Sequence, residues 1–219
     1  YDVPAGVDYV HCTSNNTIFG TQMKEFPKTE APLVCDMSSD IFSRELDFSQ
    51  FDLIYAGAQK NMGPAGTTLV VVKDEILGKT GRVIPSMLDY KVHISKDSMY
   101  NTPSVFAVYV SMLTLDWLKG LGGIKEIEKK NVEKAQLLYN EIDRNPLFRG
   151  AAATEDRSDM NVTFLLTDDS KKEEFDALCK AKGINGINGH RSVGGYRASI
   201  YNAMPIESVA VLVDIMKSL

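Results

Sequence analysis

The stretch FDLIYAGAQKNMGPAGTTLVVVK, residues 51–73, places Lys60 between two apolar runs. Both runs are rich in Val, Ile and Leu and do not alternate cleanly, a pattern typical of strands covered on both faces. The segment between them, residues 61–68, is too short for the helical crossover that parallel strands need, so we expect the two strands to pair antiparallel. A lysine at such a junction is unusual, because lysine normally lies in solvent.

Two more apolar runs precede this stretch, one around Tyr9 and Val10 and one at PLVCD, residues 32–36. In open α/β sheets, ligand-binding groups gather at the carboxyl ends of the strands. Asp36, Lys60 and Thr17 each follow one of these runs. The first half of the chain is therefore predicted to be an α/β sheet with a ligand site at that edge.

A helix is predicted to end the first half of the chain. The segment 103–120 is apolar nearly all round and predicts a buried helix that starts near Pro103. Leu121–Gly123 ends this helix and marks a domain boundary, which divides the chain into residues 1–120 and 121–219. From Ile124 to Ile142 the apolar residues share one helical face, and the Lys/Glu-rich face opposite is interpreted as solvated. A strand, a helix, a strand and a helix then predict a small α+β unit, at residues 160–167, 171–182, 196–203 and 205–219.

Composition limits the classes of function. The chain has 219 residues, of which 44% are hydrophobic, and a net charge of −5, which gives no general attraction to nucleic acid or acidic membranes. No apolar run reaches the ~20 residues of a membrane helix and no signal peptide opens the chain, so we expect a cytoplasmic protein. Cys12, Cys35 and Cys179 suit reduced thiols, and the scattered histidines argue against a metal site. Because the chain starts without Met, we expect it to come from the middle of a longer protein.

Lys60 fits one cofactor chemistry better than another. A phosphate-binding P-loop has its glycines before the lysine and a helix after it, whereas here the glycines follow Lys60 and a strand comes next. Pyridoxal phosphate needs a lysine amine for its Schiff base and a carboxylate facing its pyridine nitrogen. Lys60 and Asp36 could supply these groups, although each alone is more often a solvated lysine or a turn residue.

The segment GHRSVGGYR, residues 189–197, gathers three potentially cationic side chains in a glycine-rich stretch of an acidic protein. His190, Arg191 and Arg197 could bind a substrate that carries both a carboxylate and a phosphate, because the guanidinium fork matches both groups. A solvated basic turn is the alternative interpretation.

Four segments together resemble the phosphoserine aminotransferase family: VCDMSSDIFSR (34–44), YAGAQKNMGPAG (55–66), MYNTPSVFAVY (99–109) and GHRSVGGYRASIYNAMP (189–205). This is a family of pyridoxal-phosphate enzymes within the class V aminotransferases, and the resemblance covers essentially the whole chain. It implies the aspartate-aminotransferase fold, which is fold type I of these enzymes. Residues 1–120 would be the C-terminal portion of the large, mostly parallel sheet domain that binds the cofactor, and residues 121–219 would be the small α+β domain.

The resemblance also implies a reaction. The amino group would be exchanged between O-phospho-L-serine with 2-oxoglutarate and 3-phosphohydroxypyruvate with glutamate, in the cytoplasmic biosynthesis of serine and also of pyridoxine. Lys60 resembles the catalytic Schiff-base lysine and Asp36 resembles the partner of the pyridine nitrogen. Thr17 matches a threonine that contacts the ring oxygen of the cofactor, and Gln59 matches a residue that contacts its phosphate.

Further positions match residues that complete the family's site. Asn101 and Thr102 match a pair that reaches the cofactor phosphate of the neighbouring subunit, which implies a homodimer with shared sites. Arg197 resembles the arginine that binds the substrate α-carboxylate, and His190 and Arg191 match residues near the substrate phosphate. Family members also carry a segment before the equivalent of residue 1 that helps to bind the cofactor.

Two other interpretations remain open at this point. A related enzyme, such as an alanine–glyoxylate aminotransferase or a cysteine desulfurase, could share Lys60 and Asp36, although neither uses the phosphorylated substrate that His190 and Arg191 indicate. A non-catalytic dimerising fragment is the second alternative.

Overall fold

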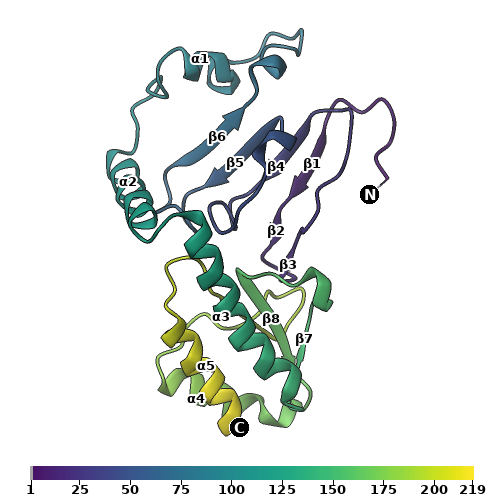
Figure 1. Cartoon of the computed structure of the whole chain (residues 1–219), viewed down its shortest axis with the longest axis vertical. Helices are drawn as coiled ribbons and strands as arrows, with labels where there is room; N and C mark the ends of the chain where they lie inside the picture. Colours follow the sequence, from purple (N-terminus) through teal and green to yellow (C-terminus); the bar gives the residue numbers. More distant parts are fainter. Residues whose placement is uncertain (1) are drawn as a thin grey trace.

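A four-stranded sheet organises the first part of the chain, and the computed structural model describes residues 2–219 (Figure 1). Its strand order is β1–β4–β5–β6; β1, β4 and β5 are parallel and β6 is antiparallel to β5. The predicted antiparallel pairing is confirmed, since the connection in residues 58–67 holds a turn and no crossover helix. The strands are β1 Val10–Thr13, β4 Leu33–Asp36, β5 Leu53–Gly57 and β6 Thr68–Val72, with a two-stranded hairpin of β2 Asn15–Asn16 and β3 Thr21–Gln22 beside them.

One face of this sheet holds a hydrophobic core. Alternate side chains of β4 and β5, such as Cys35 and Ile54, are buried there among residues of the connecting loops, including Phe26 and Met37. The opposite face carries Asp36, which is only partly buried. The expectation that both faces of the last two strands are covered is wrong for β6, where Val71 is 53% exposed among the described residues.

Helix α2, Val105–Gly120, follows the short helix α1, Tyr90–Ile94. Its position was predicted correctly, but the prediction that it is buried is wrong in this structure. Only Ala107, Ser111 and Leu118 are buried, and Phe106 is 73% exposed. A helix that is apolar on all sides is expected to be packed on all sides, whereas in this structure residues 2–219 cover only one side of α2. The exposed apolar side chains of α2 are Val105, Phe106, Val108, Tyr109, Met112, Leu113 and Trp117.

The second part of the chain places three helices against one antiparallel sheet, of strand order β7–β8–β9. Helix α3 leads into it from the four-stranded sheet, and the C-terminus lies at its far end (Figure 1). The predicted strands and helices are confirmed, and the sequence missed only the short β7. The elements are α3 Ile124–Arg144, β7 Phe148–Gly150, β8 Asn161–Leu166, α4 Lys172–Ala181, β9 Tyr196–Ser199 and α5 Ile206–Ser218, with 3₁₀ turns along the whole chain at 48–50, 74–76, 86–88, 154–156 and 169–171.

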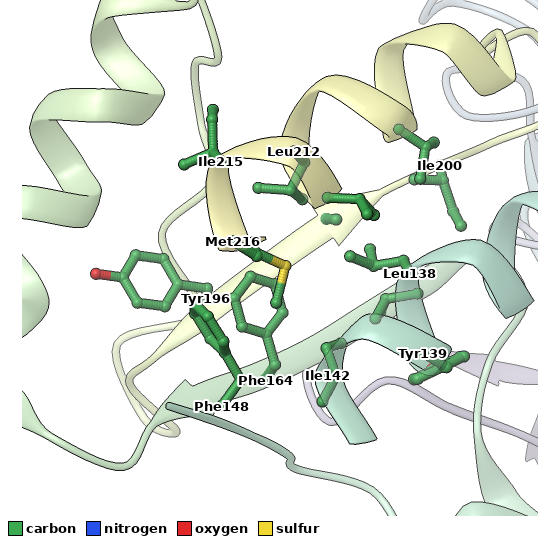
Figure 2. Close-up of a cluster of buried hydrophobic side chains, with 14 of the residues drawn as sticks. Leu138, Tyr139, Ile142, Phe148, Phe164, Tyr196, Ile200, Leu212, Ile215 and Met216 are labelled. Atoms are coloured by element: carbon green, nitrogen blue, oxygen red, sulfur yellow. The ribbon is translucent and has the colours of Figure 1, made fainter. Parts of the chain in front are cut away.

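Aromatic rings and aliphatic side chains form the core between this sheet and its helices, as Figure 2 shows. Phe164 of β8 stacks on Tyr196 of β9 with a centroid distance of 5.4 Å, and Phe148 and Phe175 meet Phe164 edge-on. Because successive strand residues point to opposite faces, the neighbours of this stacked pair project away from the core. Arg197 is one of those neighbours and is therefore directed to the other face of the sheet.

The polar face of α3 differs from the prediction at two positions. Lys134 and Glu141 are both about 2% exposed, so the interpretation of this face as fully solvated is wrong for them. Lys134 Nζ donates to the carbonyl oxygens of Ile200 and Tyr201 at 2.9 and 2.8 Å. Glu141 forms an ion pair with Arg144. Long charged side chains can be buried where their polar ends find such partners.

No single helix among residues 2–219 is long and apolar enough to cross a membrane. Among these residues, only α2 and α3 together have the length and hydropathy of a membrane span, and the chain bends by 86° between them.

Candidate active site

Three predicted site residues lie at the carboxyl edge of the parallel strands. Thr13 of β1, Asp36 of β4 and Tyr55 of β5 are in register, so Asp36 ends the middle of the three strands. Lys60 lies in the turn after β5, and Thr17 lies in the turn of the β2–β3 hairpin that follows β1. Thr17, Asp36 and Lys60 thus all follow the carboxyl ends of the parallel strands, at the edge that the sequence indicated.

The carboxylate of Asp36 is held by the local backbone. Its Oδ1 accepts a hydrogen bond from the Ser38 amide at 2.8 Å. The Asp36 carbonyl oxygen accepts from the Ser14 amide and hydroxyl at 3.0 and 3.1 Å, which ties the ends of β1 and β4 together. Burial raises the pKa of Tyr55, and the negative charge of the neighbouring Asp36 raises it further. Asp36 therefore presents a fixed carboxylate on the open face of the sheet.

A buried network of hydrogen bonds around Asp40 lies next to this edge, and the sequence pattern did not predict it. Asp40 is about 1% exposed and accepts hydrogen bonds from Ser14 Oγ, from Gln22 Nε2 at 3.2 Å and from Arg44 Nη2 at 3.2 Å. Burial raises the pKa of Asp40, and the positive charge of Arg44 opposes this shift. The i, i+4 spacing of Asp40 and Arg44 was the available signal for this pair. Since Ser14 contacts both Asp36 and Asp40, the network helps to fix Asp36.

Lys60 is partly buried in a tight turn. Met62 and Gly63 donate their amides to the Ala58 carbonyl oxygen at 3.0 and 2.9 Å, which closes the turn. Among residues 2–219, the Lys60 amine makes no hydrogen bond and no ion pair. A Cβ atom on Gly63 would come within 2.7 Å of Ser111 Oγ, so the glycine lets α2 pack directly against the turn. The amine is thus left available on a tightly packed support.

Gln59 is exposed beside this lysine. Its side chain folds back over β5, because a Cβ atom on Gly57 would lie 2.6 Å from Gln59 Oε1. The Gln59 amide group therefore lies near the end of the strand.

Arg197 joins the second part of the chain to this edge. Its Nη1 donates to the Thr17 carbonyl oxygen at 3.0 Å, a contact between residues 180 positions apart. Thr163, its register partner on β8, donates from Oγ1 to the Phe19 carbonyl oxygen at 2.8 Å. Arg197 Nε is buried and has no partner in the described part of the chain. An unpaired buried donor costs about 1–3 kcal/mol.

His190 and Arg191 lie in a loop that closes on itself before β9. The Gly189 amide donates to the Gly195 carbonyl oxygen at 2.8 Å, and His190 Nδ1 contacts Ser192 Oγ at 2.7 Å. Arg191 is exposed, and its side chain makes no hydrogen bond within residues 2–219. The structure therefore places the side chains of His190 and Arg191 in one loop, six or seven residues before Arg197.

Asn101 and Thr102 lie apart from the other predicted residues. Both are exposed in the segment before α2, and Asn101 Nδ2 donates only to the Thr102 carbonyl oxygen at 3.3 Å. The expectation that they reach the cofactor of a neighbouring subunit stays a prediction.

The group of residues at this edge fits pyridoxal phosphate. An unengaged lysine amine, a fixed carboxylate and a partly buried arginine offer partners for an aldehyde, a pyridine nitrogen and an anionic substrate. No group of three His, Cys, Asp or Glu side chains among the described residues could hold a metal ion. Cys12, Cys35 and Cys179 are free thiols, as expected.

Comparison with known proteins defines the class. The family model for aminotransferase class-V matches residues 3–212, and the chain belongs to that family. It has fold type I of the pyridoxal-phosphate-dependent aminotransferases, as its solved structural neighbours show. The alanine–glyoxylate aminotransferase of Nostoc sp., 14% identical with a TM-score of 0.77 over 96% of this chain and 61% of the other, shares the fold alone.

The particular proteins that the chain resembles are phosphoserine aminotransferases. It is 76% identical to that of Flavobacterium johnsoniae, over 100% of this chain and 62% of the relative. The solved phosphoserine aminotransferase of Bacillus circulans subsp. alkalophilus is 44% identical with a TM-score of 0.94, over 99% of this chain and 60% of the other. The pyridoxal-phosphate-bound enzyme of Trichomonas vaginalis is 35% identical with a TM-score of 0.92, over 99% and 62%. The chain spans about three fifths of the length of these relatives.

Proposed function

We propose that the protein acts as a phosphoserine transaminase. It would transfer the amino group of O-phospho-L-serine to 2-oxoglutarate, reversibly, and so form 3-phosphohydroxypyruvate and glutamate. The observation that carries the proposal is the partly buried contact of Arg197 with the Thr17 backbone, beside the edge that carries Asp36. It supports a site in which Arg197 would bind an amino-acid carboxylate at the same edge as the Lys60 amine. The identity of 76% to a phosphoserine aminotransferase supports the same reaction.

Pyridoxal phosphate, when bound, would supply an electron sink for the substrate carbanion. Lys60 would hold its aldehyde group and afterwards move a proton at the substrate Cα, as a general acid–base. Asp36 would bind the pyridine nitrogen, because its carboxylate is fixed on the open face of the sheet. Thr17 would contact the ring oxygen and Gln59 the phosphate.

The substrate would be bound from the second part of the chain. Arg197 would bind the α-carboxylate through the part of its guanidinium group that stays accessible. His190 and Arg191 would bind the substrate phosphate from the loop before β9. Because this loop is closed by its own hydrogen bonds, both side chains start from a defined backbone.

We also propose the division into residues 1–120, as part of the large domain, and residues 121–219, as the small domain. Two separate hydrophobic clusters, one on each side of this boundary, support it. The homodimer with Asn101 and Thr102 at the partner's cofactor is a further proposal, and the exposed apolar side chains of α2 support an association surface. The proposed setting is serine and pyridoxine biosynthesis in the cytoplasm.

Reduction with borohydride tests the cofactor site on the native gene product. A pyridoxyl group should become fixed on Lys60, and Lys73 in the same peptide region serves as the internal control. Label on Lys73 or Lys79 in place of Lys60 would refute the assignment.

Single-turnover rates test the substrate assignment. Truncation of one partner of a buried charge pair costs roughly 2–5 kcal/mol, which is about thirty- to several-thousand-fold in rate. Arg197→Ala should slow the half-reactions with glutamate and with phosphoserine alike, because both substrates carry an α-carboxylate. Arg191→Ala should slow the phosphoserine half-reaction much more. Equal losses for Arg191→Ala would remove its phosphate-specific role and favour a related class V aminotransferase.

A further inference from the structure

The residue after Lys60 connects the two parts of the chain. Asn61 is 7% exposed. Its Oδ1 accepts from the backbone amide of Asn202 at 3.1 Å, and its Nδ2 donates to the Ile41 carbonyl oxygen at 3.2 Å. Asn202 lies between β9 and α5, 141 residues away from Asn61. The turn that carries Lys60 is therefore hydrogen-bonded directly to the second part of the chain.

Two more buried asparagines extend this contact. Asn202 Nδ2 donates to the Phe42 carbonyl oxygen at 3.0 Å, and Asn202 Oδ1 accepts from Asn131 Nδ2 at 2.8 Å. Asn131 Nδ2 also donates to the Ser43 carbonyl oxygen at 3.0 Å. Neither Asn131 nor Asn202 is more than 6% exposed. We name Asn61, Asn131 and Asn202 the asparagine triad.

The triad engages three consecutive carbonyl groups of one turn. Ile41, Phe42 and Ser43 each accept from a different asparagine side chain. Phe42 has a φ of 58°, a left-handed conformation that is strained for a residue other than glycine. Such a conformation persists where the surroundings determine it strongly, and it is frequent at functional sites. The triad is the surrounding that holds the Phe42 turn.

Helix α3 fixes the far end of the triad. Lys134 follows Asn131 by three residues and so lies on the same side of the helix. Its Nζ donates to the carbonyl oxygens of Ile200 and Tyr201, the two residues before Asn202. The segment 200–202 is thus bound to α3 by two side chains before it meets Asn61.

We propose that Asn202 and Asn131 are positioning residues for Lys60, acting through Asn61. Apolar packing could join the two parts of the chain equally well, but polar contacts that are buried and paired select one geometry. The geometry selected here is that of the turn that presents the Lys60 amine to the cofactor edge. The inference rests on the proposed role of Lys60 and adds that residues of the second part of the chain set the orientation of its amine.

The test measures the environment of the Lys60 amine rather than turnover. The pyridoxal-phosphate–lysine adduct has a visible absorption band, and the pH midpoint of that band reports the environment of the amine. Asn202→Ala should shift this midpoint by about half a unit or more, because it removes the two side-chain hydrogen bonds, to Phe42 and from Asn131, that hold the Asn202 backbone amide against Asn61. Asn131→Ala should shift it in the same direction. The double variant should shift it no further than Asn202→Ala does, since both side chains act through one connection.

Asn145→Ala is the matched control. Asn145 Nδ2 donates to Glu141 Oε1 and to the Met216 carbonyl oxygen at 3.0 and 2.9 Å, at the far end of α3. This variant should lose stability like the others but keep the midpoint of the wild type. If Asn202→Ala does not fold, Asn202→Asp carries the measurement, because it keeps the acceptor for Asn131 and loses the donor to Phe42.

The outcomes separate the inference from the proposed function. An unchanged midpoint in folded Asn202→Ala or Asn202→Asp would overturn the positioning role while borohydride still labels Lys60. An equal shift in Asn145→Ala would also overturn it, since the effect would then follow from general loss of stability. Labelling of another lysine in the wild type would refute the proposed function itself.

Discussion

Arg44→Met should destabilise the protein, and the size of the loss should depend on pH. The variant removes the cation that faces Asp40 at 3.2 Å, where the Asp40 side chain is fully buried and that of Arg44 is 12% exposed. Methionine keeps much of the side-chain volume and supplies no charge. At neutral pH, leaving a buried charge without its partner costs about 3–5 kcal/mol in the free energy of unfolding. The donor to the Met23 carbonyl oxygen, at 2.8 Å, is lost as well.

The pH dependence follows from the direction of the Asp40 shift. Burial holds the pKa of Asp40 above its ordinary value of 3.8, and Arg44 limits the rise. Between the pKa values of the unfolded and folded states, the folded protein binds more protons, so stability falls as the pH rises through that interval. Removal of Arg44 widens the interval. At acid pH, where Asp40 is protonated in both states, the variant should lose only about 1 kcal/mol, from its lost hydrogen bonds.

Urea denaturation at acid and at neutral pH, with wild type and variant compared at each, measures the effect. Lys73→Met is the matched control, because Lys73 pairs with Asp52 at 3.1 Å with side chains 42% and 25% exposed. Such a surface pair contributes about 0–1 kcal/mol, and its loss should change little between the two pH values. Adding Asp40→Asn to Arg44→Met should restore much of the stability. A loss that is the same at both pH values, or a double variant no more stable than the single one, would contradict the reasoning.

Three further variants test other contacts. Burial lowers the pKa of Lys134 to about 8 from 10.5, so the unfolded state binds more protons than the folded state between these pH values. The free energy of unfolding of the wild type should therefore rise by roughly 3 kcal/mol as the pH rises through this interval. Urea denaturation of Lys134→Met should show no such rise. Tyr139→Phe removes the hydrogen bond from the Tyr139 hydroxyl to the Ser158 carbonyl oxygen at 3.0 Å and should cost about 0.5–1.5 kcal/mol in the same assay, so an unchanged midpoint would show that water replaces it. Gly189→Ala would place a Cβ atom against the Gly194 carbonyl oxygen and distort the loop that carries His190. The Kd for phosphoserine should rise at least about tenfold, while the free energy of unfolding should change by less than about 1 kcal/mol. Unaltered binding would show that the substrate phosphate is bound elsewhere.

The strands and helices were predictable because their signals are local. The apolar runs ending at Asp36 and before Lys60 became β4 and β5, and the short length of the segment 61–68 indicated the antiparallel partner of β5. The rule that ligand groups gather at the carboxyl ends of strands located the edge of the candidate site without knowledge of any contact.

The remaining features depend on partners far along the chain. The sequence pattern predicts Lys134 to be a surface residue of α3. Its burial is explained only by its hydrogen bonds to the carbonyl oxygens of residues 200 and 201. Asn61 follows Lys60 directly, yet nothing local indicates its contact with Asn202. The exposure of α2 was missed for the converse reason, since a residue pattern reports a preference for burial and not what covers it. Sequence identified the candidate residues, and the fold determines which of them meet.

The contacts of the Asn15 side chain can form only late in the synthesis of the chain. This side chain hydrogen-bonds Asn161 and Ser158, which are 146 and 143 positions further along, and its neighbour Thr17 meets Arg197 after 180 positions. At about 5–20 residues per second, a ribosome delivers these partners roughly 7–35 s after the hairpin of β2 and β3 has been made. Two-residue strands are too short to hold a hairpin alone during that time. The edge that bears Thr17 can therefore acquire its shape only after residues 158–197 have been made, and a translational pause near residue 150 would prolong the exposure of that edge to chaperones and proteases.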